Sequence, residues 1–327
     1  MNFKKIFSIF LRVGISLVLL VLLFKLNKIN FYDLISDIKS ADKLLLTIAG
    51  CIFFITYILC FLRWQMLLKA AGIDIPLKRM IISFSGGIFF SIFLPSTIGG
   101  DVVRTADLAV HTKKTKEVFA TVFLDRISGF VGLVIVILPA FLFGGKLIQD
   151  KVVMLSVGII VILLTLILLV LFNKFIYLKI TGFLNSPGSR KIKESIKDLH
   201  YEIHIFRHRK KVIVYNLILS FLVQVISPIS VYFIALSLGV KVNIIYFYIF
   251  MPIIGAITLL PISIGGLGLR ESSFVLYFAK VGVVKQLAVA ISLLSFTFIL
   301  IFGALGGLIY VSTIRHRRLQ HNKPSAV

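Results

Sequence analysis

One stretch of eleven residues occurs twice in this sequence. The first copy, residues 94–104, reads LPSTIGGDVVR, and the second copy, residues 260–270, reads LPISIGGLGLR. Leucine, proline, isoleucine, a glycine pair and arginine recur at the same positions, with a constant offset of 166 residues in a chain of 327. Self-similarity at a fixed offset of about half the chain indicates an internal duplication.

Each copy contains a proline followed by a glycine pair, a combination that interrupts a helix. Proline lacks the amide hydrogen, and glycine gives the backbone access to positive φ. Irregular backbone at membrane depth is tolerated only where it is buried in protein or lines a cavity, so two matched breaks point to a transport site. The alternative is a sharp loop at the membrane surface. The break residues are Pro95, Gly99, Gly100, Pro261, Gly265 and Gly266.

The composition predicts an all-α integral membrane protein, most simply one polytopic domain over residues 1–327. Hydrophobic residues make up 59% of the chain and charged residues only 15%. A net charge of +23 would suggest nucleic-acid binding in a soluble protein, but here the basic residues cluster between apolar runs. This is typical of cytoplasmic loops beside an anionic leaflet. We therefore expect a location in the cell (inner) membrane, with anionic membrane lipids and no nucleic acid as partners.

The distribution of charge predicts the topology. With the basic loops inside, both termini are cytoplasmic, and the two interrupted segments become re-entrant helical hairpins that enter from opposite sides. The halves, repeat 1 at about 6–143 and repeat 2 at about 152–311, then form an inverted-topology repeat, as in secondary transporters. Six full spans are expected at 6–26, 44–62, 118–143, 152–172, 212–238 and 286–311, hairpins near 80–104 and 246–270, and a polar connection at 27–43.

The longest polar stretch, residues 173–211, carries ten Lys or Arg and three acidic residues, so we expect a basic cytoplasmic segment. Its apolar residues follow a helical period, which predicts an amphipathic helix in the headgroup layer. His200, His204 and His208 lie at i, i+4 and i+8, a spacing that can bind a metal. A polar interfacial face explains them as well, and we expect neither a metal nor another cofactor.

Arg104 and Arg270 are the first candidates for a binding site, because each follows its glycine pair by four residues. An arginine fork suits a phosphate, and a helix start adds free N–H groups, so the pair is interpreted as a lipid-phosphate clamp. The alternative is that each arginine caps its own hairpin or marks topology. Ionisable residues at membrane depth are functional suspects by default; these are Asp101, Asp125, Arg126 and Glu271, joined by the hydroxyls of Ser96, Thr97 and Ser263.

The carboxylates leave several roles open. Asp125 and Glu271 can pair with the arginines, bind a cationic headgroup or carry protons. Signals for an enzyme are few, since none of the six histidines lies inside a predicted span and no familiar hydrolase, kinase or dinucleotide motif occurs. The break hydroxyls have no neighbouring base in the sequence. We therefore assign no catalytic residue.

Several motifs together resemble the lysylphosphatidylglycerol synthase transmembrane family. They are Arg63-Trp64 at the end of the second span, the turn at 69–72, the stretch at 94–104, Asp125-Arg126 and the stretch at 260–271. The resemblance covers nearly the whole chain. It implies a flippase-like lipid translocator, which in the synthases moves lysyl-phosphatidylglycerol to the outer leaflet. The chain stops at Val327, so the acyltransferase domain that gives the family its lysyltransferase name is expected to be absent.

A second resemblance supplies an enzyme alternative. Undecaprenyl-diphosphate phosphatases also look like inverted repeats with two re-entrant hairpins, and their turns are similar to residues 93–100. Their chemistry needs a carboxylate-rich turn and a histidine beside the serine. Here Asp74 is the only acidic residue between Arg63 and Gly100.

The sequence thus predicts a flippase-like membrane protein that translocates or binds a phospholipid or lipid-linked anionic headgroup, for example aminoacylated phosphatidylglycerol. Alternating access would move the repeats around a midplane site. One alternative is a membrane component that acts with a separate lipid-modifying enzyme and docks it on residues 173–211. A further alternative is a lipid-diphosphate phosphatase.

Overall fold

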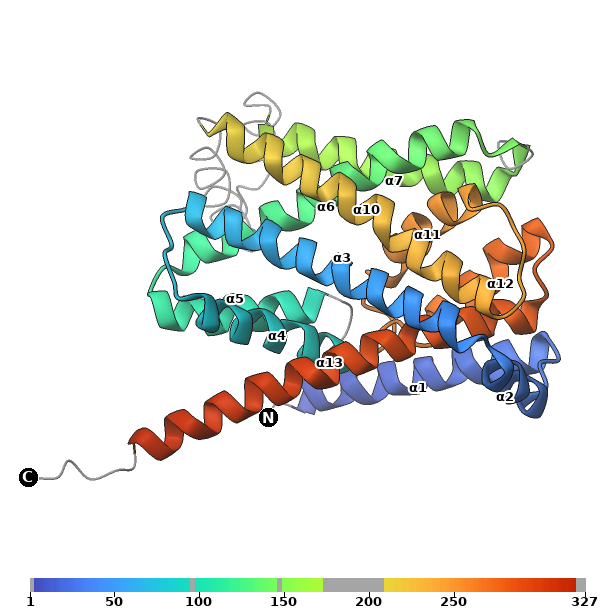
Figure 1. Ribbon diagram of the computed structural model, residues 1–327, viewed down its shortest axis with the longest axis horizontal. Helices are drawn as coiled ribbons and strands as arrows, with labels where there is room; N and C mark the ends of the chain where they lie inside the picture. The colour runs from blue at the N-terminus through green and yellow to red at the C-terminus, as the bar shows by residue number, and fades with distance from the viewer. Residues whose placement is uncertain (1–2, 95–97, 146–148, 173–208, 322–327) are drawn as a thin grey trace, which may run out of the picture. The chain divides into compact units, whose positions relative to one another are not determined.

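A computed structural model describes residues 3–94, 98–145, 149–172 and 209–321 (Figure 1). Every regular element in those ranges is a helix, which confirms the all-α membrane fold. The first break at 95–97 and most of the basic segment, 173–208, lie outside the described residues. The prediction of an amphipathic helix and a histidine row there therefore stays a prediction.

Each predicted full span corresponds to one long helix. Of the described helices, α3, α6, α7, α10 and α13 are long and apolar enough to cross a membrane alone. The part of α1 that was compared, Leu11–Leu26, meets that criterion together with α2, from which it is bent by 92°. The bounds are α1 Phe3–Leu26, α3 Lys43–Ala70, α6 Thr115–Leu142, α7 Lys151–Phe172, α10 Lys210–Ser237 and α13 Lys285–His321. The chain is a multi-pass membrane protein; the side on which each terminus lies stays a prediction.

The polar connection predicted at 27–43 is wrong in its middle part, which forms α2 (Phe31–Ser40). Asn30 caps this helix, because its side-chain oxygen accepts a hydrogen bond of 2.9 Å from the backbone amide of Tyr32. Balanced charges in this stretch concealed apolar residues at helical spacing. One of them, Leu34, is fully buried.

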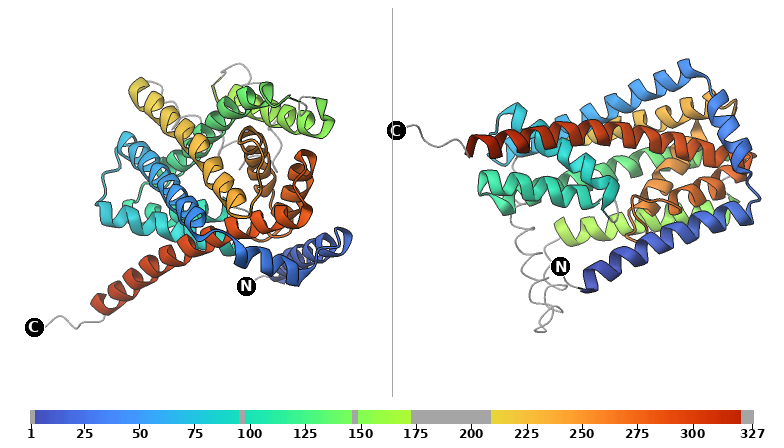
Figure 2. Two further views of the ribbon diagram at one scale, coloured as in Figure 1. Left: turned by 45° about the vertical axis from the view of Figure 1, so that its right-hand side comes forward. Right: turned by 90° about the horizontal axis from the view of Figure 1, so that it is seen from below.

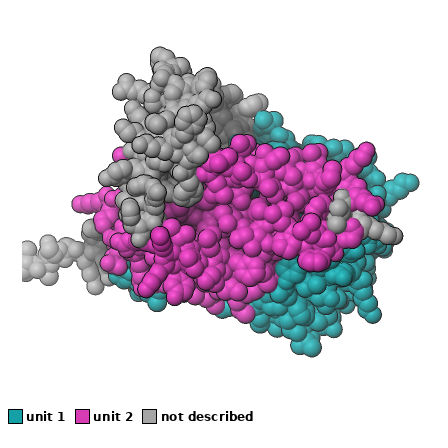
Figure 3. All heavy atoms as spheres, turned by 90° about the horizontal axis from the view of Figure 1, so that it is seen from above, with its two compact units in different colours: residues 1–54, 75–108, 229–327 teal, residues 55–74, 109–228 magenta. Residues whose placement is uncertain are grey.

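Contacts divide the chain into two compact units, coloured separately in Figure 3. Unit 1 consists of residues 1–54, 75–108 and 229–327, and unit 2 of residues 55–74 and 109–228. Each unit is described by itself. Both copies of the repeated stretch belong to unit 1.

The first repeated stretch joins α4 (Leu77–Phe93) to α5 (Ile98–Thr112), and the two helices form an antiparallel hairpin. Gly87 lies opposite Gly100, since a Cβ added at Gly100 would stand 2.2 Å from the Gly87 carbonyl oxygen. One turn further on, the Ser83 hydroxyl donates a 3.1 Å hydrogen bond to the carbonyl of Arg104. Small residues at the crossing therefore let the two backbones approach closely.

The second repeated stretch joins α11 (Ile245–Thr258) to α12 (Leu269–Phe278), which is followed by the short helix η3 (Ala279–Val281). These helices also run antiparallel, and an aromatic cluster fills the space between them. Phe247 and Phe250 both pack against Phe278, tilted and edge-on respectively, with ring centroids 4.9 and 5.2 Å apart. Figure 2 shows both hairpins, the first in teal and the second in orange. The two predicted hairpins are present; their opposite orientation in a membrane stays a prediction.

Helix α13 packs against the first hairpin through glycines. A Cβ at Gly306 would stand 2.8 Å from the carbonyl oxygen of Ser85, and one at Gly303 would stand 2.1 Å from the Ile92 side chain. On the α4 side, Gly86 accommodates the ring of Tyr310. The contact thus matches the close, small-residue helix packing that is common inside membranes.

Candidate functional site

The second break is a glycine turn in which the backbone leaves the regions open to other residues. Gly265 and Gly266 have φ of 58° and 77°, and Gly268, which precedes α12, has φ of 80°. A Cβ at Gly268 would also stand 2.6 Å from the Cβ of Leu19 in α1. Conformation and space therefore both require glycine at this turn.

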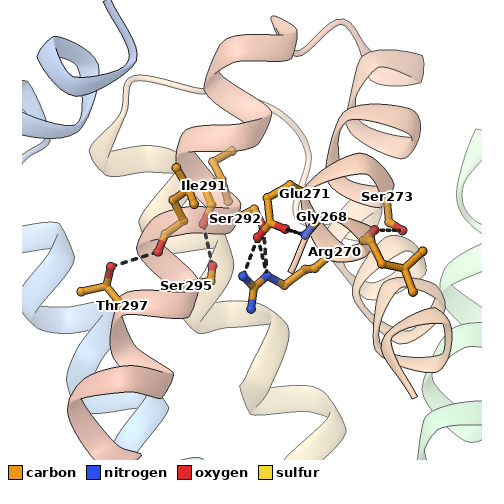
Figure 4. Close-up of polar contacts among 10 residues, drawn as sticks. Gly268, Arg270, Glu271, Ser273, Ile291, Ser292, Ser295 and Thr297 are labelled. Carbon is orange, nitrogen blue, oxygen red and sulfur yellow. Dashed lines mark hydrogen bonds and ion pairs between the residues drawn. The ribbon is translucent and has the colours of Figure 1, made fainter. Parts of the chain in front are cut away.

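Arg270 and Glu271 open α12 and form a buried ion pair (Figure 4). Glu271 is fully buried and Arg270 is 7% exposed. The Nε and Nη2 atoms of Arg270 both donate to Oε1 of Glu271. Oε2 of Glu271 accepts a 2.6 Å hydrogen bond from the backbone amide of Gly268, so the carboxylate also caps the helix.

Helix α13 completes this cluster with two side chains that sequence reasoning missed. The Ser292 hydroxyl accepts a 3.1 Å hydrogen bond from Nε of Arg270 and donates one of 3.2 Å to Oε1 of Glu271. The ring of Phe296 lies under the guanidinium, 4.2 Å from centroid to Cζ. Both residues lie on one face of α13, at i and i+4. A serine and a phenylalanine are common in an apolar span, so the sequence does not indicate that they contact Arg270.

One end of the Arg270 guanidinium remains available. Within the part of the chain that the structure describes, its Nη1 atom has no hydrogen-bond partner, and Figure 4 shows this atom without a contact. An arginine carries five N–H donors, and both protons on Nη1 are among them. The site therefore combines a buried cation with two donors that can meet an anion.

The other predicted residues of the second break surround the same turn. Ser263 is 1% exposed, and its hydroxyl oxygen is buried without a hydrogen-bond partner among the described residues. The next amide, that of Ile264, donates a 3.1 Å hydrogen bond to the Ser16 hydroxyl of α1. Pro261 is exposed. Helix α1 thus holds this turn, a contact that the sequence did not predict.

In the first hairpin, Arg104 pairs with an acid of its own helix. Its Nη2 lies 2.9 Å from Oδ1 of Asp101, one turn earlier in α5, and both residues are buried. The Phe84 ring centroid lies 5.9 Å from Cζ of Arg104. Whether Arg104 binds a lipid phosphate, or caps its hairpin or marks topology, stays a prediction.

The predicted break separates α4, which ends at Phe93, from α5, which begins at Ile98; the prediction that Gly99 and Gly100 are part of this break is wrong. Gly99 and Gly100 lie inside α5, which begins at Ile98, and neither has a positive φ. Their role is to remove side chains where α5 meets α4 and the turn. The predicted site residues Ser96 and Thr97, with Pro95, lie outside the described residues.

A second ion pair of this hairpin was missed by sequence reasoning. Nη2 of Arg79 lies 2.7 Å from Oδ2 of Asp107, and the Tyr310 hydroxyl of α13 lies 3.5 Å from Oδ1 of the same carboxylate. The register of the hairpin could have predicted this pair, because Arg79 and Asp107 are about equally far along their helices from the Gly87–Gly100 crossing.

The two breaks are neighbours within unit 1. A Cβ at Gly265 would stand 3.0 Å from the carbonyl oxygen of Ile92, two residues before the first break. Ile92 in turn contacts Gly303 of α13. The end of α4, the glycine turn and the middle of α13 therefore meet at one place.

Asp125 and Arg126, also predicted as site residues, lie in unit 2. Oδ1 of Asp125 lies 2.6 Å from Nε of Arg63. Nη1 of Arg63 also donates a 3.1 Å hydrogen bond to the Ser220 hydroxyl. Arg63 and Trp64, expected at a membrane interface, are buried because α3 continues to Ala70 and this network holds them. Arg126 is half-buried.

Metal-ligating side chains do not gather in the described ranges. No three residues among their His, Cys, Asp and Glu lie close enough to hold a metal ion.

Comparison with known proteins supports a membrane family. A family model described as "Lysylphosphatidylglycerol synthase TM region" matches residues 9–307. A UPF0104 membrane protein of Pyrococcus horikoshii is 27% identical over 307 residues, which is 86% of this chain and 89% of that protein.

A second archaeal relative gives the same result. A UPF0104 membrane protein of Methanothermobacter thermautotrophicus is 25% identical over 276 residues, 77% of this chain and 80% of that protein. No solved structure matches. Because the family model extends over most of the sequence, including both hairpins, the chain belongs to the lysylphosphatidylglycerol synthase transmembrane family.

Proposed function

We propose that this protein binds the phosphate of an anionic phospholipid, or of a related lipid-linked headgroup, and moves that lipid between leaflets. The observation that carries the proposal is the guanidinium of Arg270. It is buried, already held on one side by Glu271 and Ser292, and has Nη1 left without a partner among the described residues. Such an arginine is oriented in advance, so little side-chain entropy is lost when an anion binds.

The hydrogen bonds favour an anion over a cation as ligand. Both oxygens of Glu271 are occupied, Oε1 by Arg270 and Ser292 and Oε2 by the amide of Gly268. A lipid ammonium group would therefore have to displace existing donors. A phosphate oxygen would meet Nη1 donors that have no other partner in the part of the chain that the structure describes.

The surroundings of the arginine support transport more than static binding. Broken helices that line a cavity at membrane depth are typical of transporter sites. Here the glycine turn before Arg270 lies against the end of α4, beside the first break. Membership of the lysylphosphatidylglycerol synthase transmembrane family agrees with a lipid as the transported molecule.

Leaflet sidedness in proteoliposomes tests the proposal. Fluorescent phosphatidylglycerol and its lysyl derivative are placed in both leaflets, and their access to an external reducing agent is followed. Wild-type protein should move both lipids, because they share the phosphate. Arg270→Gln should slow movement by about tenfold or more, since loss of a charge-assisted hydrogen bond costs about 1.5–3 kcal/mol.

Two further variants make the result specific. Arg270→Lys keeps the charge but loses the fork geometry and should recover only part of the rate. Lys285→Ala removes an exposed cation at the start of α13 and should behave like wild type. If the wild-type protein moved neither lipid, translocation would be excluded for them. Phosphate release from a lipid diphosphate and capture of a separate lipid-modifying enzyme would then be measured in turn.

A further inference from the structure

Helix α2 leaves the direction of α1 sharply. The axes of the two helices differ in direction by 92°. Three linker residues and Asn30, which caps α2, connect them. Lys28 in this linker has φ of 51°, an unusual conformation for a side-chain-bearing residue. The backbone thus adopts an unfavourable conformation to turn the chain, whereas a helix that continued along the direction of α1 would require no such turn.

One side of α2 is attached to the protein. Leu34 is 1% exposed, and Oδ2 of Asp37 accepts a 2.6 Å hydrogen bond from the Gln286 side chain in the first turn of α13. Both contacts lie within unit 1. Asp33, Ser36 and Lys39 are all exposed. Ser36 lies on the same face as Tyr32, at i and i+4, whereas Asp33 lies about 100° further round the helix and marks its polar side.

Two aromatic rings stand out from the first turn of this helix. Phe31 is 59% exposed and Tyr32 is 83% exposed. Phe31 touches Phe24 near the end of α1, with ring centroids 6.5 Å apart, so the pair stands where the apolar run ends. Aromatic side chains, Tyr above all, are enriched at the boundary between hydrocarbon and water.

We propose that α2 lies along the membrane surface, with Phe31 and Tyr32 anchored in the lipid headgroup layer. Ten residues of helix span only about 15 Å, roughly half of a hydrocarbon core, so α2 does not complete the span that α1 begins. Its exposed Asp33 and Lys39 would also face hydrocarbon there, at a cost of several kcal/mol. The lipid surface is thus the occupant that fits both the aromatic edge and the polar side.

Fluorescence quenching tests this placement and does not depend on lipid transport. Trp64 is the only tryptophan of the chain and is fully buried, so wild-type protein supplies the background. Tyr32→Trp places a reporter on the aromatic edge, and Asp33→Trp places one on the polar side of the same helix, about 100° away. Each variant is reconstituted in lipids brominated near the headgroup or near the chain end, and is also exposed to aqueous iodide.

The Tyr32→Trp signal should be lost to bromine near the headgroup and much less to bromine near the chain end. The Asp33→Trp signal should be lost to iodide instead. Quenching of both reporters by bromine near the chain end would overturn the proposal in favour of one broken span. Quenching of both by iodide alone would overturn it in favour of an aqueous loop. A thermal unfolding midpoint in detergent close to that of wild-type protein verifies that each variant has folded.

Discussion

The two hairpins carry the same motif but use its residues differently. In the first hairpin, Gly99 and Gly100 are helical and serve close packing between α4 and α5. In the second, Gly265 and Gly266 form a turn with positive φ and are not helical. The same glycine pair thus allows close helix packing in one copy and a backbone with positive φ in the other.

The arginines differ in the same way. Arg104 is neutralised by Asp101 one turn earlier on α5, whereas Arg270 is neutralised by the next residue, Glu271, and by a helix from elsewhere in unit 1. At the offset of 166 residues the acid of each copy is replaced by an uncharged residue, Leu267 and Thr105. Both copies of the repeated stretch carry the cation, and a different acidic residue pairs with it in each.

The largest expected effect separates the two acids. Glu271→Gln leaves a buried guanidinium without its counter-charge and should lower the free energy of unfolding by about 3–5 kcal/mol. Asp101→Asn should cost less, because that carboxylate side chain is 12% exposed where Glu271 is at 0%. Thermal unfolding in detergent measures both. Equal losses would remove the distinction between the pairs, and Arg270→Met combined with Glu271→Gln should recover part of the loss.

The glycine pairs should differ in the kind of damage. Gly100→Ala places a methyl group 2.2 Å from a backbone oxygen that cannot move alone, and should destabilise by about 1–3 kcal/mol. Gly266→Ala has space but must adopt a positive φ, at about 1–2 kcal/mol. Gly255→Ala in α11, with nothing within 4 Å of the new methyl group, serves as the control and should be neutral or stabilising. A greater loss at Gly266 than at Gly100 would contradict this account.

The serines that flank each arginine give a smaller contrast. Ser292→Ala removes two hydrogen bonds to charged groups and should cost about 1.5–3 kcal/mol. Ser83→Ala removes one hydrogen bond to the carbonyl of Arg104 and should cost about 1 kcal/mol. Unfolding midpoints, measured in one detergent, decide the order. Ser292→Thr, which retains the hydroxyl, should lie nearer to wild type unless the added methyl group clashes.

The aromatic partners should give the smallest difference. The ring of Phe296 lies 4.2 Å from Cζ of Arg270, whereas that of Phe84 lies 5.9 Å from Cζ of Arg104. Cation–π attraction weakens beyond about 6 Å, so Phe296→Leu should cost about 1 kcal/mol more than Phe84→Leu. If the two substitutions cost the same, packing rather than the ring quadrupole would explain both contacts.

Much of the fold could be predicted because its signal is local. Apolar run lengths and breaker residues predicted the long helices and both hairpins, and only α2 was missed, where balanced charges hid apolar positions at helical spacing. Helix ends were less accurate. Helix α3 continues past Arg63 because a buried acid, Asp125, lies opposite it, and no local pattern announces such a partner.

Of the site, only the residues in and next to the repeated stretch could be predicted from the sequence. Arg270, Glu271 and Ser263 follow from the repeat and from the rule that ionisable residues at membrane depth have a purpose. Ser292, Phe296 and Ser16 come from helices far away in the chain, so their roles depend on tertiary contacts. The pairing of Arg79 with Asp107 lies between these cases, because it requires only the register of a hairpin already predicted.

The glycine contact between α4 and α13 also bears on how the protein is made. Unit 1 draws on the beginning, the middle and the last third of the chain, and the whole of residues 109–228 is synthesised between its parts. During synthesis the first hairpin therefore enters the membrane before Gly303, Gly306 and the Tyr310 ring exist to receive it. The nascent chain must keep α4 and α5 together by their own contacts, such as the Gly87–Gly100 crossing and the Arg79–Asp107 pair, until α13 leaves the ribosome.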